Sequence, residues 1–77
     1  MERIAFDYAK LKGRIVEKCG SQKAFADKLG ISEATMTSKL AGSTYFSQNE
    51  IIRSMDILDI EPGSVTAYFF TPRVEKT

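Results

Sequence analysis

Large apolar residues recur along the first part of the chain at steps of three and four positions, which is the spacing of an amphipathic α-helix. Asp7 lies just before this stripe, where we expect it to cap the helix, and Gly20 follows the stripe, where we expect the helix to end. The stripe consists of Tyr8, Leu11, Ile15 and Cys19. The pattern predicts a first helix between the two flanking residues.

Two shorter helices are predicted next, because serine, a preferred N-cap residue, twice precedes a new group of apolar positions. Ser21 is expected to begin a helix that ends at Gly30. Ser32 is expected to begin another helix, which ends at Gly42. The inward residues of the first are Phe25, Ala26 and Leu29, and in the second a hydrophobic staple joins Ile31 to Met36.

The stretch FSQNEI carries two signals for the start of a fourth helix. Ser47 and Glu50 have the spacing of a capping box, and Phe46 and Ile51 have the spacing of a hydrophobic staple. The helix that follows is expected to bury Ile51, Met55 and Leu58, with Ile52 beside them.

A last short helical turn is predicted after residues 61–63 and ends before Pro72. The only stretch that alternates with a period of two is SVTAYFF, and this stretch also fits a helical turn. The sequence therefore predicts an all-α fold, a compact five-helix domain spanning 1–77, with a tail that frays from about residue 71. Its predicted core is Phe25, Leu29, Ile31, Met36, Leu40, Ile51, Met55 and Leu58.

Size and composition exclude several functional classes. The chain has 77 residues, close to the lower limit at which an apolar core alone holds a fold, and an apolar share of 43%, which argues against disorder throughout. It has no histidine and one cysteine, Cys19, so it lacks the side chains for a zinc site, a histidine-based catalytic centre or an internal disulfide. We expect no enzyme activity, no metal and no cofactor.

The sequence also contains no apolar run long enough to span a bilayer, and its first residues lack the apolar segment and cleavage site of a secretory signal. A single cysteine fits a reducing compartment. We therefore expect a cytoplasmic protein with no membrane partner and no small-molecule ligand.

The formal net charge of +1 hides an uneven distribution. Residues 1–39 hold eight Lys/Arg against five Asp/Glu, a net of +3, whereas residues 40–77 hold three against five, a net of −2. Such a division favours one face directed toward a polyanion and another face turned away. Random scatter of solvated charges is an equally good interpretation of this division taken alone.

Residues 21–42 contain two predicted helices joined by the short link LGIS, with a glycine in the turn. So short a link makes two helices cross at a steep angle, and Ala26, four residues before Gly30, is small enough to lie where they touch. Met36, six residues after the glycine, is apolar and expected to point into the core. Together with Gln22 at the start, this set resembles the helix-turn-helix of the lambda-repressor and Cro type, a five-helix DNA-binding family abundant in phages and prophages.

The resemblance extends loosely over residues 7–70 and implies that the second helix of the motif enters the major groove of DNA. Small polar side chains on its outer face would let this helix sit deep in the groove. The residues implied to contact bases are Glu33, Ala34, Thr37 and Ser38. The residues implied to contact the DNA backbone are Ser21, Gln22, Lys23, Lys39, Ser43, Thr44 and Tyr45.

Lys39 departs from the family pattern, which usually has an apolar residue nine positions after the turn glycine. This departure leaves open whether Ser38 or Lys39 faces the groove. Glu33 is equally well explained as a carboxylate that suits the positive N-terminal end of a helix. The cations of the first helix, Lys10, Lys12 and Arg14, are interpreted as a solvated face.

The resemblance implies a sequence-specific regulator of transcription that binds double-stranded DNA, a phage Cro-like protein or small repressor that occupies an operator in the bacterial cytoplasm and nucleoid. The low net charge favours a homodimer on DNA, and Tyr68 or Phe70 of the stretch AYFF is the candidate contact between copies. Two alternatives stay open. One is a protein-interaction module, such as an antirepressor or antitoxin, with the same fold, and the other is a helical bundle without a DNA partner.

Overall fold

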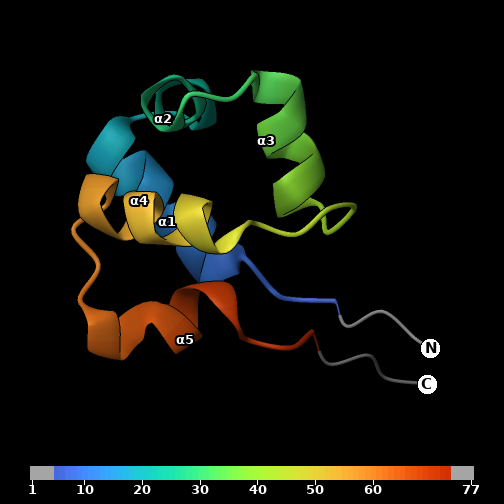
Figure 1. Cartoon of the computed structure of the whole chain (residues 1–77), viewed down its shortest axis with the longest axis vertical. Coiled ribbons are helices and arrows are strands. Elements are labelled where there is room, and N and C mark those ends of the chain that lie inside the picture. Colours follow the sequence, from blue (N-terminus) through green and yellow to red (C-terminus); the bar gives the residue numbers. More distant parts are fainter. Residues whose placement is uncertain (1–4, 74–77) are drawn as a thin grey trace.

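The computed structural model describes residues 5–73, which form five α-helices and one 3₁₀ turn (Figure 1). This range contains no strand, only an isolated antiparallel bridge between Phe6 and Pro72. The prediction of an all-α fold with five helices is confirmed. The elements are α1 (Ala9–Cys19), α2 (Gln22–Leu29), α3 (Glu33–Leu40), α4 (Gln48–Ile57), the 3₁₀ turn η1 (Pro62–Ser64) and α5 (Val65–Phe69).

Serine side chains begin three of these helices, as the sequence predicts. The hydroxyl groups of Ser21, Ser32 and Ser47 each accept a 3.1 Å hydrogen bond from the backbone N–H three residues later. At α4 the carboxylate of Glu50 accepts a 2.8 Å bond from the backbone N–H of Ser47, which completes the predicted capping box. Each cap satisfies amides that the helix itself leaves without a partner.

The start of α1 differs from the prediction. Tyr8, not Asp7, occupies the N-cap position, and its ring is buried in the core. Asp7 accepts a 2.9 Å hydrogen bond from the N–H of Ala9 and so supports the first turn from one residue further upstream. The packing of the tyrosine ring and the hydrogen bond to Asp7 together fix this end of the helix.

The core lies where α1, α2 and α4 meet and is closed by α5. Of the predicted core residues, Phe25, Leu29, Met36, Leu40 and Leu58 are buried, and Ile31, Ile51 and Met55 are half-buried and pack against them. The core also contains residues that the sequence interpretation left out of its core set: Tyr8, Leu11, Ile15, Ala26, Phe46, Ile60 and Phe69.

Ile52, which the sequence places beside the buried residues of this helix, is 66% exposed. Ile52 lies four residues after Gln48 and four before Asp56, so it shares the outward face of α4 with two exposed polar residues. The buried face of the helix carries Ser54 instead, whose hydroxyl donates a 2.7 Å hydrogen bond to the carbonyl of Glu50.

The first residues of the tail that was expected to fray from about residue 71 make backbone hydrogen bonds, and fraying of the tail stays a prediction. The N–H of Asp7 donates to the carbonyl of Thr71 (2.7 Å), and the N–H of Arg73 donates to the carbonyl of Ala5 (2.8 Å). The segments before α1 and after α5 therefore run side by side along one edge of the molecule (Figure 1). Residues 74–77 of the predicted tail lie outside the described residues.

Candidate functional site

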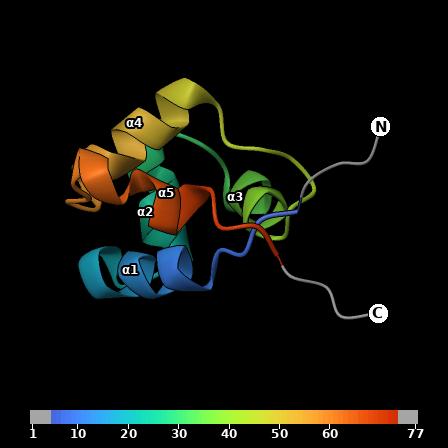
Figure 2. The same ribbon diagram turned by 90° about the horizontal axis from the view of Figure 1, so that it is seen from below.

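The motif formed by α2 and α3 has the geometry that its spacing predicts. Gly30 lies between the helices in the left-handed region (φ 85°), and its N–H donates to the carbonyl of Ala26 (2.9 Å). This backbone conformation raises the free energy of residues that have a Cβ atom, so a glycine is favoured at this position. Ala26 is fully buried, as expected of a small residue at a helix crossing. Figure 2 shows α3 at the edge of the molecule, beyond α1, α2 and α4.

An arginine from α4 holds the motif against the rest of the fold. The guanidinium of Arg53 donates hydrogen bonds to the carbonyls of Leu29 (2.7 Å) and Lys28 (3.3 Å) at the end of α2. These carbonyls are among those that a helix leaves unpaired at its C-terminus. Arg53 thus stabilises the position of the motif on α4.

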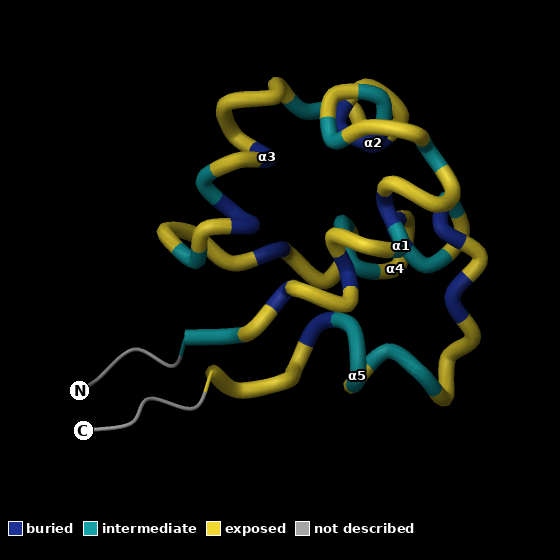
Figure 3. The backbone as a smooth tube through the Cα atoms, turned by 180° about the vertical axis from the view of Figure 1, so that it is seen from behind, coloured by how far each residue is buried: buried dark blue, intermediate teal, exposed yellow. Residues whose placement is uncertain are grey.

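One face of α3 is directed away from the core. Glu33, Ala34 and Thr37 are exposed and Ser38 is half-buried, whereas Met36 and Leu40 are buried (Figure 3). The structure therefore brings the predicted base-contacting residues together on one surface. We call this surface the α3 face and define it as Glu33, Ala34, Thr37 and Ser38.

The start of α2 lies directly beside the α3 face. The amide Nε2 of Gln22 donates a 2.7 Å hydrogen bond to the hydroxyl of Thr37, so this glutamine links α2 to α3. Lys23 is exposed and lies 3.6 Å from the carboxylate of Asp27, one helical turn further along. Ser21 uses its hydroxyl to cap α2. Each of these predicted backbone contacts thus has a partner within the fold.

Lys39, also predicted to contact the DNA backbone, is turned inward and does not belong to this surface. Its ammonium lies 3.0 Å from the carboxylate of Glu50, donates to the carbonyl of Tyr45 (3.0 Å) and sits 5.8 Å from the centre of the Phe46 ring. The residue is 9% exposed. Of the two residues between which the sequence left the choice open, Ser38 is the more outward, and its contact with DNA stays a prediction.

Glu50 is the partner that makes this inward position of Lys39 possible. Its carboxylate receives the N–H of Ser47 and the ammonium of Lys39 at the same oxygen. Burial raises the pKa of Glu50, but the backbone hydrogen bond from Ser47 and the charge of Lys39 outweigh burial, so the pKa lies below its usual value. The carboxylate therefore remains ionised and ties the end of α3 to the start of α4.

The predicted loop contacts Ser43, Thr44 and Tyr45 are exposed. Between Glu33 and Tyr45 the only cation is Lys39, which is buried and paired, whereas Glu33 adds an exposed negative charge. The candidate surface is consequently small and polar, and it carries no exposed positive charge on α3 or on the loop that follows.

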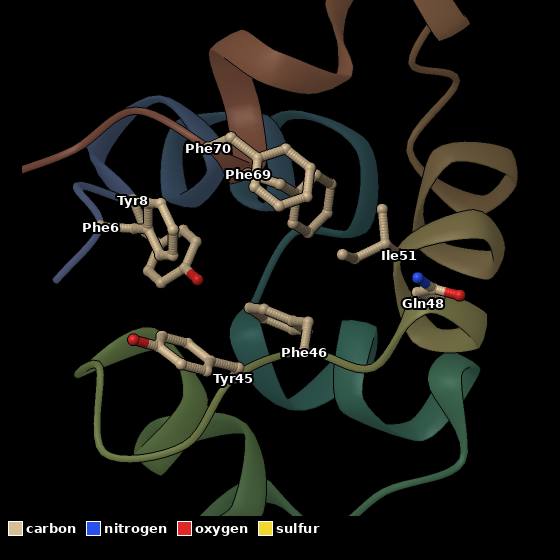
Figure 4. A pocket seen from close by; sticks show the side chains of 8 residues that line it. All are labelled: Phe6, Tyr8, Tyr45, Phe46, Gln48, Ile51, Phe69 and Phe70. Atoms are coloured by element: carbon tan, nitrogen blue, oxygen red, sulfur yellow. The ribbon is translucent and has the colours of Figure 1, made fainter. Parts of the chain in front are cut away.

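A hollow of about 380 Å³ lies beyond this loop, and the sequence interpretation assigned it no role. Figure 4 shows the rings of Tyr45 and Phe46 on one side of the hollow and those of Phe69 and Phe70 on the other. Most of its ring pairs are edge to face, and the ring centres of Phe46 and Phe69 lie 5.4 Å apart. We call this region the aromatic hollow. It is lined by Phe6, Tyr8, Tyr45, Phe46, Gln48, Ile51, Phe69 and Phe70.

The stretch AYFF, predicted to supply a contact between two copies of the chain, divides between core and surface. Phe69 is buried, Phe70 is 44% exposed, and Tyr68 is half-buried with the Lys10 ammonium 4.9 Å from its ring centre. Phe69 thus closes the monomer's own core. Contact between copies through Phe70 or Tyr68 stays a prediction.

Neither a metal site nor a membrane span is found in the part of the chain that the structure describes. No three His, Cys, Asp or Glu residues within 5–73 gather closely enough to hold a metal ion. No helix in the same range is long and apolar enough to cross a bilayer.

Comparisons with known proteins place the chain in a family. The fold is similar to the solution structure of the modulator of repression (MOR) of the temperate bacteriophage TP901-1 from Lactococcus lactis, with a TM-score of 0.78 and 37% sequence identity over 92% of this chain and 96% of that one. No curated protein matches the sequence. The resemblance to lambda-repressor and Cro proteins stays a prediction. Residues 4–72 match the family described as "Protein of unknown function (DUF739)", and the chain belongs to that family.

Proposed function

We propose that this chain is a small phage-type regulator that modulates repression by binding another protein, with the α3 face as its contact surface. Its structural relative is named a modulator of repression, and the protein target that we assign to this chain is a repressor. The observation that carries the proposal is the inward position of Lys39, which leaves the α3 face without a cation. The protein-interaction alternative that the sequence left open thus becomes the leading one.

Electrostatics favour a protein partner over DNA. Proteins that bind duplex DNA gain most of their affinity from Lys and Arg placed against phosphates, and they lose affinity when carboxylates approach the backbone. The α3 face offers Glu33 in place of such a cation. A DNA-binding protein presents the opposite, basic surface, so a repressor's own DNA-binding face is a natural partner for this carboxylate.

The short side chains of the α3 face suit close contact with another protein. Ala34, Thr37 and Ser38 let a partner's backbone or helix approach closely, and the hydroxyl groups supply hydrogen bonds at short range. The Gln22–Thr37 hydrogen bond fixes one of these hydroxyl groups in advance. A surface fixed before binding loses less entropy when the complex forms.

Direct DNA binding remains the second candidate, and the geometry of the motif favours it. The crossing at Ala26, the turn at Gly30 and the position of Gln22 at the start of α2 all fit a helix-turn-helix. If this candidate is right, Lys23→Ala weakens binding to every duplex and lowers the salt slope of log K by about one unit. Glu33→Gln would change the preferred base with a discrimination of about 1–3 kcal/mol.

One pair of measurements separates the two candidates. The purified chain is mixed with the repressor encoded by the same genome, and complex formation is followed by titration calorimetry. In parallel it is mixed with a random duplex pool at moderate salt, and the retained DNA is sequenced. We expect a complex with the repressor and no enriched sequence. A sharp DNA motif without a repressor complex would contradict the proposal and establish the second candidate.

A matched pair of substitutions locates the surface. Glu33→Gln removes the exposed carboxylate of the α3 face, and Glu61→Gln removes an exposed carboxylate at the start of η1. Both change the net charge by the same amount. We expect only Glu33→Gln to weaken the repressor complex, by about fivefold, because only this carboxylate lies at the contact. Equal effects of the two substitutions would exclude the α3 face.

A further inference from the structure

A small depression lies beside the α3 face, where α1, the start of α2 and the end of α3 meet. It has a volume of about 120 Å³, enough for part of one aliphatic side chain. Ile15 and Leu40 are buried and form its floor, and the more accessible Val16, Lys12 and Gln22 form its rim. We call it the α1 depression.

Val16 is the unusual residue of this group, because it is 62% exposed although it is apolar. It lies off the stripe that α1 buries, and four residues after Lys12, so these two side chains are neighbours on the outer surface of the helix. Single exposed apolar residues are common on proteins. Here the exposed residue borders a concave apolar surface, so one partner side chain could contact both.

The α1 depression is continuous with the α3 face. Gln22 forms part of its rim and also donates the 2.7 Å hydrogen bond to Thr37, which belongs to the α3 face. A partner that lies on α3 can therefore contact the depression across Gln22.

The charges at the two ends of this combined surface have opposite sign. Glu33 lies at the start of α3, and Lys12 lies at the rim of the depression. Among residues 5–73 neither charge has an ion-pair partner, in contrast to Lys18 (3.9 Å from Asp59) and Lys23. Two unpaired charges of opposite sign define both the chemistry and the orientation of a partner.

We propose that the α1 depression is the second half of the partner-binding surface and that it receives the end of one aliphatic side chain from the partner. A carboxylate next to that side chain pairs with Lys12, while a cation further along the partner meets Glu33. The partner is a protein segment with a basic residue, an aliphatic residue and an acidic residue in this spatial order. This inference rests on the proposed function and adds the partner's chemistry to it.

Two matched pairs of substitutions test the depression. Val16→Ser removes its apolar rim, and Ile52→Ser removes a side chain of similar exposure (66%) from α4. Lys12→Glu reverses the rim charge, and Lys28→Glu reverses an exposed charge at the end of α2 with the same change in net charge. All four positions are exposed, so thermal unfolding should show similar stability for all the variants.

The measurement is titration calorimetry of each variant with the repressor of the same genome. We expect Val16→Ser and Lys12→Glu each to weaken the complex by roughly tenfold, because both sites lie at the contact, and the two control variants to stay within about twofold of the parent. Equal affinities within each pair would overturn the inference.

Backbone NMR shifts of the labelled chain, recorded with and without the repressor, provide an independent map. We expect the amides of Lys12, Val16 and Gln22 to shift together with those of the α3 face. If binding shifts only the amides of the α3 face, or only those of the aromatic hollow, the inference is wrong, although the chain still binds a protein. A complete lack of binding would overturn the proposed function itself.

Discussion

The α2–α3 motif and the aromatic hollow differ in how the chain assembles them. The motif is one continuous stretch, residues 21–42, with its own caps and turn. The hollow gathers rings from three stretches that lie far apart in the sequence: the segment before α1, the loop before α4 and the end of α5. The motif presents short polar side chains, whereas the hollow presents aromatic ones.

The two regions therefore have different roles: the motif can provide binding specificity, and the aromatic hollow can provide stability. The motif depends on local rules, and its outer residues can vary without loss of the fold, so it is suited to carry specificity. The hollow depends on contacts between distant segments, and its rings bring the segment before α1 and the segment after α5 together. Substitutions in the hollow should therefore cost more stability than substitutions on the motif surface.

The largest effect is expected at Phe46, which is 7% exposed and lies 5.6 Å from the ring of Tyr8 and 5.4 Å from that of Phe69. Phe46→Ala should lower the free energy of unfolding by about 3–5 kcal/mol, because it leaves a cavity among these rings. Phe70→Ala, at a ring 44% exposed, should cost much less. Urea titration followed by circular dichroism measures both, and a loss at Phe46→Ala no larger than the loss at Phe70→Ala would contradict this prediction.

The next effect tests the crossing of the two motif helices. Ala26 is fully buried between them, so Ala26→Leu should lower the free energy of unfolding by about 1–3 kcal/mol or more by forcing them apart. Ala34→Leu makes the same change on the exposed α3 face and should be nearly neutral. If Ala26→Leu melts at the temperature of the parent chain, the close crossing is wrong.

The motif could be predicted from the sequence because its signals are local. A serine at each helix start, Gly30 in the turn and Ala26 four residues earlier are read within short windows, and the structure confirms each of them. The capping box of α4 is local in the same way. Capping and turn formation involve neighbours in sequence, so no knowledge of the tertiary fold is needed.

The features that the sequence did not predict all depend on contacts between residues far apart in the chain. Lys39 occupies a position where an apolar residue is expected, and its long stem can fill that position while its ammonium reaches Glu50, eleven residues later. Nothing local indicates that the capping glutamate has this second partner. The pairing of residues 5–7 with 71–73 and the convergence of rings in the aromatic hollow were missed for the same reason.

The Lys39–Glu50 ion pair joins the two regions, and its removal should show how strongly they depend on each other. Lys39→Met keeps an unbranched side chain in the core position but leaves the Glu50 carboxylate without its cation, and we expect a loss of about 1–2 kcal/mol. The loss is limited because the N–H of Ser47 still donates to that carboxylate. Lys28→Met, on the exposed side of α2, serves as the control, and an equal effect there would mean that the pair contributes nothing.

The smallest effect is the dependence of stability on pH through Glu50. Because its pKa in the folded chain lies below the unfolded value, its contribution to stability is present above the unfolded pKa and is lost as pH falls through the folded pKa. Glu50→Gln removes this titration, so the variant should lose less stability than the parent between about pH 6 and about pH 3. Glu61→Gln, at an exposed carboxylate, controls for general acid effects. Melting temperatures of the three proteins across this range provide the measurement. Parallel curves for the parent and Glu50→Gln would mean that the carboxylate between the motif and the hollow does not stabilise their junction.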